Sequence, residues 1–446
     1  MNSLIHKVTH YLHDSLGEEG AKWGLSLIDQ KTGKSLAWQD NEWFIPASNQ
    51  KLWTSAVALD QLGPDYRWTT QFGVSDQTLW VIGGGDPVYS WDDVCHMVRC
   101  LKERGVKKID RICLDDSLFQ SERWGTGWMW DDLVMGFAAP IHALNLEENR
   151  IPFQISFQDE GIQLENPFSF VESRLDASRL EVSPSDETEY TLVRTENRYD
   201  YVACGVIARD EEEMEAAVES GPEFFYLAIR SACQYAGIEI DEQVSFFVQP
   251  ISQELLETSS IHLFHESPPL AEVLKLVNQD SRNLVAEVLL RTLPLQQDGV
   301  GSVEAGVKIV EDVCKHWNLK LPGRYVDGSG LSTYNFSSPL TLRKLLEHML
   351  EHPNTFTFQE SLAQLGKSGT LEHRDLELPS SWDLKAKTGT VNGVKTLSGY
   401  LYEHGEVRII FSCMINGLIK EDHGAEMGNY LIRELIASLD DHNLSK

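Results

Sequence analysis

The chain has 446 residues, a hydrophobic fraction of 42% and a formal net charge of −30 at pH 7. This length exceeds one ordinary domain, so we expect two or three domains with full apolar cores. The negative charge argues against nucleic-acid binding, which needs a basic surface, and no apolar run reaches the roughly 18 residues of a transmembrane segment.

The seven cysteines are scattered, odd in number and without the C-x-x-C spacing of a metal site. We therefore expect buried small side chains and no disulfide framework. The segment Met1–Gly17 carries Lys7, His10, His13 and Asp14, and it predicts an amphipathic helix with no visible secretory signal. Either the chain is a mature form or it stays inside the cell.

The first half of the chain begins with the strand patterns Trp23–Asp29 and Ser35–Trp38, which predict a hairpin. The apolar run Trp53–Leu59 then predicts a helix. From Gly63 to about His265 the pattern changes to short strands and turns. The elements expected there are strands within Thr69–Ile82 and Lys107–Leu114, a helix at Asp92–Arg104, strands over Ile151–Ala208, and a long helix near Glu211–Ala236.

The second half returns to helices and then forms a sheet. The elements expected there are helices at Pro269–Val277 and Leu284–Leu293, antiparallel strands at Leu384–Val391, Val394–Tyr402 and Glu406–Met414, and a closing helix at Ala425–Ser438.

Ser48 and Lys51 form an S-x-x-K pattern at the start of the helix that contains Trp53–Leu59. Side chains three residues apart share one helical face, so the Lys51 amine can reach the Ser48 hydroxyl. A serine hydroxyl becomes a useful nucleophile when an adjacent base takes its proton, and burial or a nearby cation can lower a lysine pKa enough for this role. Ser48 and Lys51 are therefore a candidate nucleophile and general base.

Two partner motifs follow downstream, each in a suitable context. Ser281-Arg282-Asn283 lies between two predicted helices, and Lys387-Thr388-Gly389 lies in a predicted strand. S-x-x-K, S-x-N and K-T-G in this order are the signature of penicillin-binding proteins and serine β-lactamases. The motifs add Ser281, Asn283, Lys387, Thr388 and Gly389 to the candidate site.

Patterns for other cofactors fail. His348, Glu351 and His352 fit a zinc spacing, but they close a helix with its own apolar stripe, and histidines are favourable at a helix C-terminus without a metal. Gly366-Lys367-Ser368 ends like a phosphate-binding loop, but Ser361 stands in place of its first glycine. We expect no metal and no cofactor.

The chain resembles the low-molecular-mass class C penicillin-binding proteins, the D-alanyl-D-alanine carboxypeptidase/endopeptidases of peptidase family S13. The resemblance runs nearly end to end. Beyond the three motifs it rests on Leu62–Arg67, Gly84–Pro87, Gly127–Asp132, Asp327–Ser332 and Ser368–Leu371.

The resemblance implies a mixed α/β (α+β) fold with a split, β-lactamase-like transpeptidase domain, whose antiparallel sheet is flanked by helices. Residues 1–62 and 267–446 are expected to form this catalytic domain. Residues 63–266 are expected to form a large strand-rich insertion between the first two motifs, divided into two nested subdomains.

The resemblance also implies the reaction. Ser48 would attack the penultimate D-alanine of a peptidoglycan stem peptide, and Ser281 and Asn283 would relay a proton and hold Lys51 and the substrate. Lys387 and Thr388 would bind the terminal carboxylate, and Lys387 would help to lower the pKa of Lys51. The backbone N–H groups of Ser48 and Thr390 would form the oxyanion hole.

A segment of the insertion is implied to contact the substrate as well. Trp128 and Asp131 match a family motif, Gly-Trp-x-x-Asp, that leans over the cleft and binds the amine at the tip of a diaminopimelate side chain. The alternative is an aromatic loop anchor with solvated acids.

Two other functions compete with this one. A serine β-lactamase of class A needs a deacylating glutamate in E-x-x-L-N, and Ile141 stands at that position in the nearest match. A non-hydrolytic β-lactam or peptidoglycan sensor would not need Lys51 or Ser281. The expected partners are the peptidoglycan peptide and inhibitory β-lactams. The resemblance implies an extracytoplasmic location, and the missing signal leaves the cytoplasm as the alternative.

Overall fold

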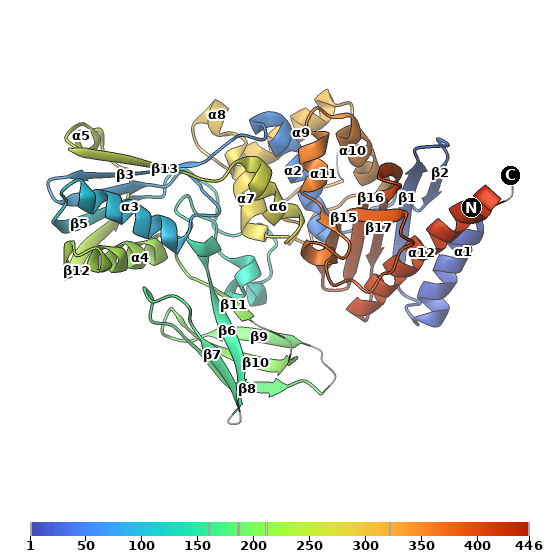
Figure 1. Cartoon of the computed structure of the whole chain (residues 1–446), viewed down its shortest axis with the longest axis horizontal. Coiled ribbons are helices and arrows are strands. Elements are labelled where there is room, and N and C mark those ends of the chain that lie inside the picture. The colour runs from blue at the N-terminus through green and yellow to red at the C-terminus, as the bar shows by residue number, and fades with distance from the viewer. Residues whose placement is uncertain are drawn as a thin grey trace.

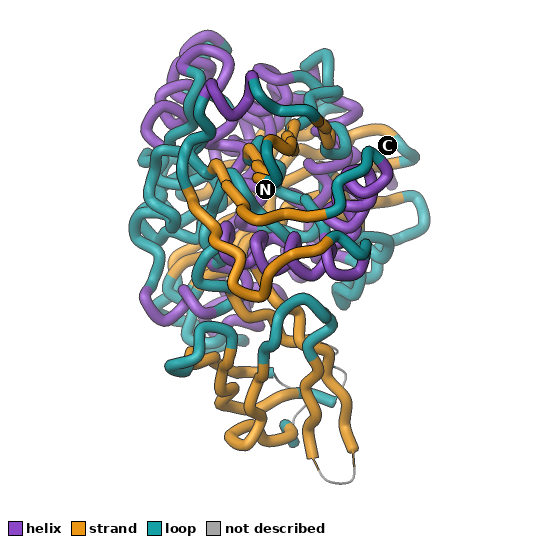
Figure 2. The backbone as a smooth tube through the Cα atoms, turned by 90° about the vertical axis from the view of Figure 1, so that its left-hand side faces the viewer, coloured by secondary structure: helices purple, strands orange, loops and turns teal. Residues whose placement is uncertain are grey.

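The computed structural model describes residues 2–158, 161–184, 188–209, 211, 213–320 and 323–444. A six-stranded sheet with its helices occupies one end of the molecule, and a five-stranded sheet occupies the other (Figure 1). Two three-stranded sheets project from the middle as a separate lobe (Figure 2).

The six-stranded sheet joins the two ends of the chain. Its order is β14-β15-β16-β17-β1-β2, and every neighbouring pair is antiparallel. The N-terminal hairpin pairs with the last strand, so that Trp23 lies opposite Ile415. The strands are β1 (Lys22–Asp29), β2 (Ser35–Trp38), β14 (Ala363–Gln364), β15 (Trp382–Val391), β16 (Val394–Glu403) and β17 (Glu406–Asn416).

Helices cover both faces of this sheet because its strands are apolar on both sides. On β17, Ile409 packs with α1 and α12, while Ile410 packs in the core that contains α2 and α10, as the alternation of side chains along a strand requires. The helices of this part are α1 (Asn2–His10), α2 (Gln50–Leu62), α6 (Leu270–Asn278), α7 (Asn283–Thr292), α8 (Leu295–Asp298), α9 (Val303–His316), α10 (Pro339–Glu351), α11 (Thr355–Glu360) and α12 (Glu421–Leu444).

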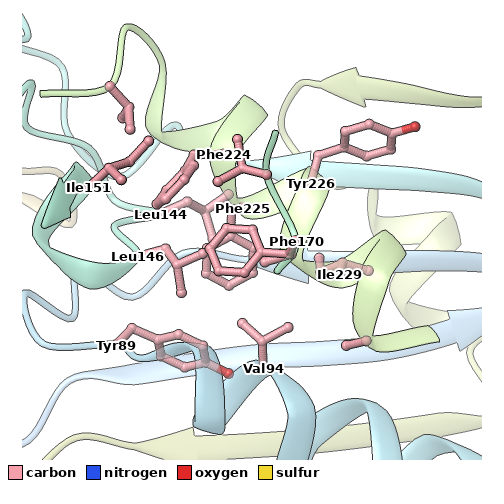
Figure 3. Close-up of a cluster of buried hydrophobic side chains, with 14 of the residues drawn as sticks. Tyr89, Val94, Leu144, Leu146, Ile151, Phe170, Phe224, Phe225, Tyr226 and Ile229 are labelled. Atoms are coloured by element: carbon pink, nitrogen blue, oxygen red, sulfur yellow. The ribbon is translucent and has the colours of Figure 1, made fainter. Parts of the chain in front are cut away.

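The five-stranded sheet of the insertion is mixed, in the order β12-β5-β4-β3-β13, with β5 parallel to both of its neighbours. Helices α3 and α4 pack on each other and on this sheet. Figure 3 shows the core between them, where Tyr89 and Phe225 have ring centroids 5.4 Å apart. The elements are β3 (Thr69–Ser75), β4 (Thr78–Ile82), α3 (Trp91–Glu103), β5 (Lys108–Asp115), α4 (Gly221–Tyr235), β12 (Glu239–Val248), α5 (Gln253–Glu257) and β13 (Ile261–Glu266).

The projecting lobe consists of the sheets β11-β6-β7 and β8-β10-β9. Its strands are β6 (Arg150–Gln158), β7 (Gly161–Glu165), β8 (Arg174–Val182), β9 (Glu189–Arg194), β10 (Asp200–Ile207) and β11 (Glu213–Ala217).

The long helix predicted near Glu211–Ala236 is wrong in its first third. Residues Glu213–Ala217 form β11, which pairs with β6, and α4 begins only at Gly221. Glu, Met and Ala favour helices locally, but pairing with β6 outweighs this preference. Ser220 then caps the helix by accepting a hydrogen bond from the Glu223 amide.

The predicted mixed fold, with an antiparallel sheet flanked by helices, is confirmed. Helix α2 ends at Leu62 and β13 ends at Glu266, on either side of the insertion. We propose these positions as the domain boundaries, with the five-stranded sheet and the projecting lobe as the two nested subdomains. Among the residues that the structure describes, no helix combines the length and the apolar character that crossing a membrane requires.

Candidate active site

Ser48 lies in a short 3₁₀ turn, Ala47–Asn49, that leads directly into α2. Ala47 has a φ of 46°, in the left-handed region that non-glycine residues rarely adopt. The turn places the Ser48 hydroxyl beside the first turn of the helix, where the Lys51 Nζ lies 2.8 Å from the Ser48 Oγ. The i, i+3 spacing thus brings the two side chains into contact.

Lys51 is completely buried, and its amine has three oxygen partners. Besides Ser48, these are the Asn283 Oδ1 at 2.6 Å and the Ser329 carbonyl at 2.7 Å. Burial lowers the pKa of Lys51 to about 7, although the carboxylates of Asp327 and Glu287 act in the opposite direction. A substantial fraction of the amine is therefore neutral at physiological pH and able to accept a proton.

The second motif lies between α6 and α7. Ser281 is half-buried with a left-handed φ of 62°, and Asn283 is the first residue of α7. The Asn283 amide faces two ways, since its Oδ1 accepts from Lys51 and its Nδ2 donates to the Phe137 carbonyl at 2.8 Å. The insertion therefore helps to orient this side chain.

The third motif lies on β15, which runs beside Ser48. Gly389 is required there, because a Cβ at this position would lie 2.2 Å from the Thr396 Oγ1 and 2.9 Å from the Ser48 backbone nitrogen. Thr388 donates its hydroxyl to Thr370 at 2.7 Å, and Thr390 is exposed.

Lys387 is completely buried, and its amine donates to the Thr388 carbonyl at 3.0 Å. Burial and the positive charge of Lys51 hold the pKa of Lys387 well below its usual range. Burial is the largest cause of the lowered pKa of both amines, and the repulsion between Lys51 and Lys387 acts in the same direction.

A cavity of about 440 Å³ lies between α12 and the strands β15, β16 and β17, and neither Ser48 nor Lys51 lines it. Thr388, Gly389 and Thr390 line it together with Thr370 and Arg374. Neither Thr370 nor Arg374 was singled out from the sequence, although Thr370 lies within the stretch Ser368–Leu371 that carried part of the family resemblance.

Two buried carboxylates near Lys51 were also missed. Glu287 accepts from the Gly328 and Ser329 amides at 2.9 Å each, and it pairs with the buried Arg291. Asp327 accepts from the Trp128 indole at 3.0 Å. Glu287 lies inside an apolar helical pattern, so the sequence held no signal for its contact with the site.

The two predicted residues of the insertion are placed differently. Trp128 is half-buried and reaches the site through Asp327. Asp131 is exposed on the 3₁₀ segment Trp130–Val134. The structure therefore ties Trp128 to the site and leaves Asp131 at the surface.

The histidines of the zinc-like pattern have other contacts. The His352 Nε2 lies within hydrogen-bonding distance of the Asp60 Oδ1, at 3.1 Å, and the centroids of the His348 and Trp317 rings are 4.4 Å apart. Within the described part of the chain, no group of three His, Cys, Asp or Glu side chains could hold a metal ion.

Comparison with known proteins matches these features to one family. The family model of D-Ala-D-Ala carboxypeptidase 3 (S13) matches residues 4–434. The D-alanyl-D-alanine carboxypeptidase DacB of Haemophilus influenzae is 27% identical over 399 residues, which cover 84% of this chain and 80% of the relative. The D-alanyl-D-alanine carboxypeptidase of Actinomadura sp. is 28% identical over 425 residues, covering 90% and 78%.

The fold has the same relatives. The crystal structure of penicillin binding protein 4 from Haemophilus influenzae superposes with a TM-score of 0.77 at 24% identity, covering 95% of this chain and 99% of that one. The same protein complexed with a β-lactam superposes with a TM-score of 0.73 at 22% identity, covering 95% and 99%. The chain therefore belongs to the D-Ala-D-Ala carboxypeptidase 3 (S13) family and is a serine carboxypeptidase with a penicillin-binding fold.

Proposed function

We propose that this enzyme cleaves the terminal D-alanine from peptidoglycan stem peptides through an acyl-enzyme on Ser48. The observation that carries the proposal is the 2.8 Å contact between the Ser48 Oγ and a buried Lys51 amine whose pKa is about 7. A nucleophile paired with a base of this pKa is the requirement for acyl transfer at neutral pH.

In the first step Lys51 takes the Ser48 proton while the Oγ attacks the carbonyl of the penultimate D-alanine. The bond to the last D-alanine breaks, and its amine receives, through Ser281, the proton that Lys51 took from Ser48. Water then attacks the ester, Lys51 takes a proton from this water, and Ser48 regains its hydroxyl hydrogen. Asn283 holds Lys51 in place through their 2.6 Å contact.

The oxyanion of each tetrahedral intermediate is assigned to the backbone N–H groups of Ser48 and Thr390. The close approach of Gly389 to the Ser48 nitrogen supports this assignment, because it sets the two segments side by side. Two donors aimed at the developing negative charge are worth several kcal/mol of transition-state stabilisation.

Lys387 and Thr388 are assigned to the terminal carboxylate of the substrate. Burial and the charge of Lys51 oppose the charge of Lys387 and lower its pKa. A bound carboxylate would favour the charged amine again. Trp128 and Asp131 are assigned to the side-chain arm of the stem peptide, and endopeptidase cleavage of cross-links is the expected second reaction.

β-Lactams are the expected inhibitors because they acylate the same serine. A class A β-lactamase mechanism lacks its base, since Ile141 is buried at the position of the glutamate and the adjacent His142 pairs with Asp116. The proposal includes an extracytoplasmic location, in the periplasm or at the cell surface, because peptidoglycan lies there.

The direct test is incubation with a labelled penicillin, followed by intact mass and peptide mapping. We expect one label per chain, on the peptide that contains Ser48, and none in Ser48→Ala. A label on the alanine variant, or turnover of penicillin at β-lactamase rates, contradicts the proposal.

A further inference from the structure

The loop from Asp327 to Asn335 is organised by one buried carboxylate. The Asp327 Oδ1 accepts from the Gly330 amide at 2.8 Å and from the Asn335 Nδ2 at 2.7 Å, and its Oδ2 accepts from the Ser332 amide at 2.8 Å. The side chain is completely inaccessible to solvent. These hydrogen bonds close the loop around Asp327, so the carboxylate fixes the loop's conformation.

This loop holds the general base. Its Ser329 carbonyl accepts from the Lys51 amine at 2.7 Å, and its Gly328 carbonyl accepts from the Thr54 hydroxyl one turn further along α2. Gly330 packs so closely that a Cβ there would lie 1.9 Å from the carbonyl oxygen of Ala47, the residue before the nucleophile. A displacement of the loop would therefore move a hydrogen-bond partner of Lys51.

The fourth hydrogen bond to Asp327 comes from the insertion. The Trp128 Nε1 donates to the Asp327 Oδ2 at 3.0 Å. The chain around Trp128 is shaped for this contact, because a Cβ at Gly125 would lie 2.2 Å from the Trp128 Nε1. A Cβ at Gly127 would lie 2.7 Å from the Ser332 Oγ, on the loop itself. The segment and the loop thus meet without room for additional side chains.

We infer that Trp128 and Asp327 are positioning residues for Lys51, through which the insertion sets the geometry of the base. This inference rests on the proposed function, because it assumes that Lys51 is the base. It gives Trp128 a task in the chemical step with every substrate, in addition to the substrate-arm contact assigned above.

The charged groups around Lys51 determine the accompanying pH effect. Two carboxylates face Lys51: Glu287 on α7, which is paired with Arg291, and Asp327 on the loop. The amine of Lys387 faces Lys51 from β15. Burial and the charge of Glu287 raise the pKa of Asp327, and the hydrogen bonds from Ser332, Trp128 and Asn335 oppose this rise. Loss of the indole donor therefore makes Asp327 less anionic, which in turn lowers the pKa of Lys51.

The test compares Trp128→Phe with wild type by stopped-flow acylation with benzylpenicillin between pH 5 and pH 9. Benzylpenicillin lacks the stem-peptide arm, so a defect confined to recognition of that arm does not appear. We expect the acylation rate at the high-pH plateau of the pH–rate profile to fall about tenfold, as for the loss of a hydrogen bond to a charged group. We also expect the acidic limb of this profile, where the rate rises as Lys51 loses its proton, to move to lower pH. Trp130→Phe is the matched control, because the Trp130 side chain is 85% exposed, and it should behave as wild type.

Asp327→Asn provides a second variant. We expect its acidic limb to move to lower pH by more than in Trp128→Phe, because the substitution removes the whole negative charge of Asp327. If this variant does not fold, Trp128→Phe alone decides. An acylation rate within twofold of wild type in Trp128→Phe, or a lower rate with an unmoved acidic limb, overturns the inference. Failure of wild type to label Ser48 would instead overturn the proposed function, so the two failures are distinguishable.

Discussion

Ser48 and Lys51 are adjacent on one turn of chain, but the chemistry of this pair depends on residues far away in sequence. Lys51 donates to Asn283 and to the Ser329 carbonyl, which come from α7 and from the loop that follows α9. The amine is buried among these partners, and burial is the dominant cause of its lowered pKa. The motif brings the two side chains together, and the rest of the fold supplies the burial that lowers the pKa of Lys51.

The pH dependence of acylation follows from this pKa. Because Lys51 acts in its neutral form, the acylation rate should rise with pH as Lys51 loses its proton, with a midpoint near pH 7. Stopped-flow measurement of kcat/KM for a D-Ala-D-Ala peptide from pH 5 to pH 9 would give this midpoint. A rate that is constant across this range, or one that is still rising at pH 9 without a midpoint near pH 7, would rule out a depressed lysine base.

The two lysines of the site should fail differently when replaced. Lys51→Ala removes the base, so acylation should fall by about 10² to 10⁴ with every substrate. Lys387→Ala should lower the acylation rate most for ligands with a free carboxylate. The measurement compares a D-Ala-D-Ala peptide with its C-terminal amide in wild type and in both variants. An equal amide penalty in wild type and Lys387→Ala would show that Lys387 does not bind the carboxylate.

At the scale of elements, β15 must approach the turn of Ser48 more closely than any side chain allows. Gly389→Ala should push the strand away from Thr396 and from the Ser48 nitrogen, and we expect acylation to slow by about tenfold or more, with about 1–3 kcal/mol of destabilisation. Penicillin acylation and thermal unfolding measure the two effects. Gly20→Ala is the control, since no atom lies within 4 Å of a Cβ there. Normal acylation by Gly389→Ala would mean that the strand can move without cost.

The pairing of β1 with β17 carries a buried ion pair between Asp29 and Arg408, with contacts at 2.8 Å and 3.0 Å. Burial alone would raise the pKa of Asp29, but hydrogen bonds from Arg408, Thr32 and Lys31 lower it below the ordinary 3.8. A depressed carboxyl pKa means that ionised Asp29 stabilises the fold. This contribution is complete above the ordinary pKa and is lost as the pH falls through the folded-state value.

Asp29→Asn should therefore destabilise the protein at pH 7 by about 2–4 kcal/mol, since it leaves Arg408 with Glu403 as its remaining partner. The difference from wild type should shrink below pH 4. Urea unfolding at pH 7 and pH 3 gives both values. Asp312→Asn is the matched control, because Asp312 pairs with Lys308 and Lys315 at an exposed site, and its unfolding midpoint should not move. A difference that persists unchanged at pH 3 would contradict the assigned cause.

The limits of sequence-based prediction follow from the same elements. The strands of the catalytic sheet could be predicted because their patterns are local and continuous, as in Val394–Glu403. The segment Glu213–Ala217 was misassigned because its partner β6 lies about sixty residues earlier, and no local pattern encodes that pairing. Asp327 and Glu287 could not be assigned to the base for the same reason, since only tertiary structure brings them to Lys51.

At the scale of the whole molecule, the insertion contacts the catalytic part at the second motif as well as at Trp128. Arg282, the middle residue of Ser281-Arg282-Asn283, donates to Glu215 on β11 at 3.1 Å. Glu215 also pairs with Arg150 on β6. The projecting lobe is therefore linked by charged side chains to the turn that carries Ser281 and Asn283.

The substrate-arm assignment makes the last prediction. If Asp131 pairs with the amine at the tip of a stem-peptide side chain, Asp131→Asn should lower kcat/KM for a peptide with a free distal amine. It should lower kcat/KM much less for the acetylated twin. An exposed ion pair is worth about 0–1 kcal/mol, so we expect a loss of up to about fivefold.

The neighbouring acid provides the matched comparison. Burial and the charge of Asp131 raise the pKa of Asp132, which makes Asp132 the less favourable anion of the two. Asp132→Asn should therefore keep the preference for the free amine, while Asp131→Asn should lose it. The opposite result would transfer the role to Asp132. A preference that survives in both variants would mean that the amine is recognised outside the segment Trp130–Val134, because this segment would then contribute no charge to substrate selection.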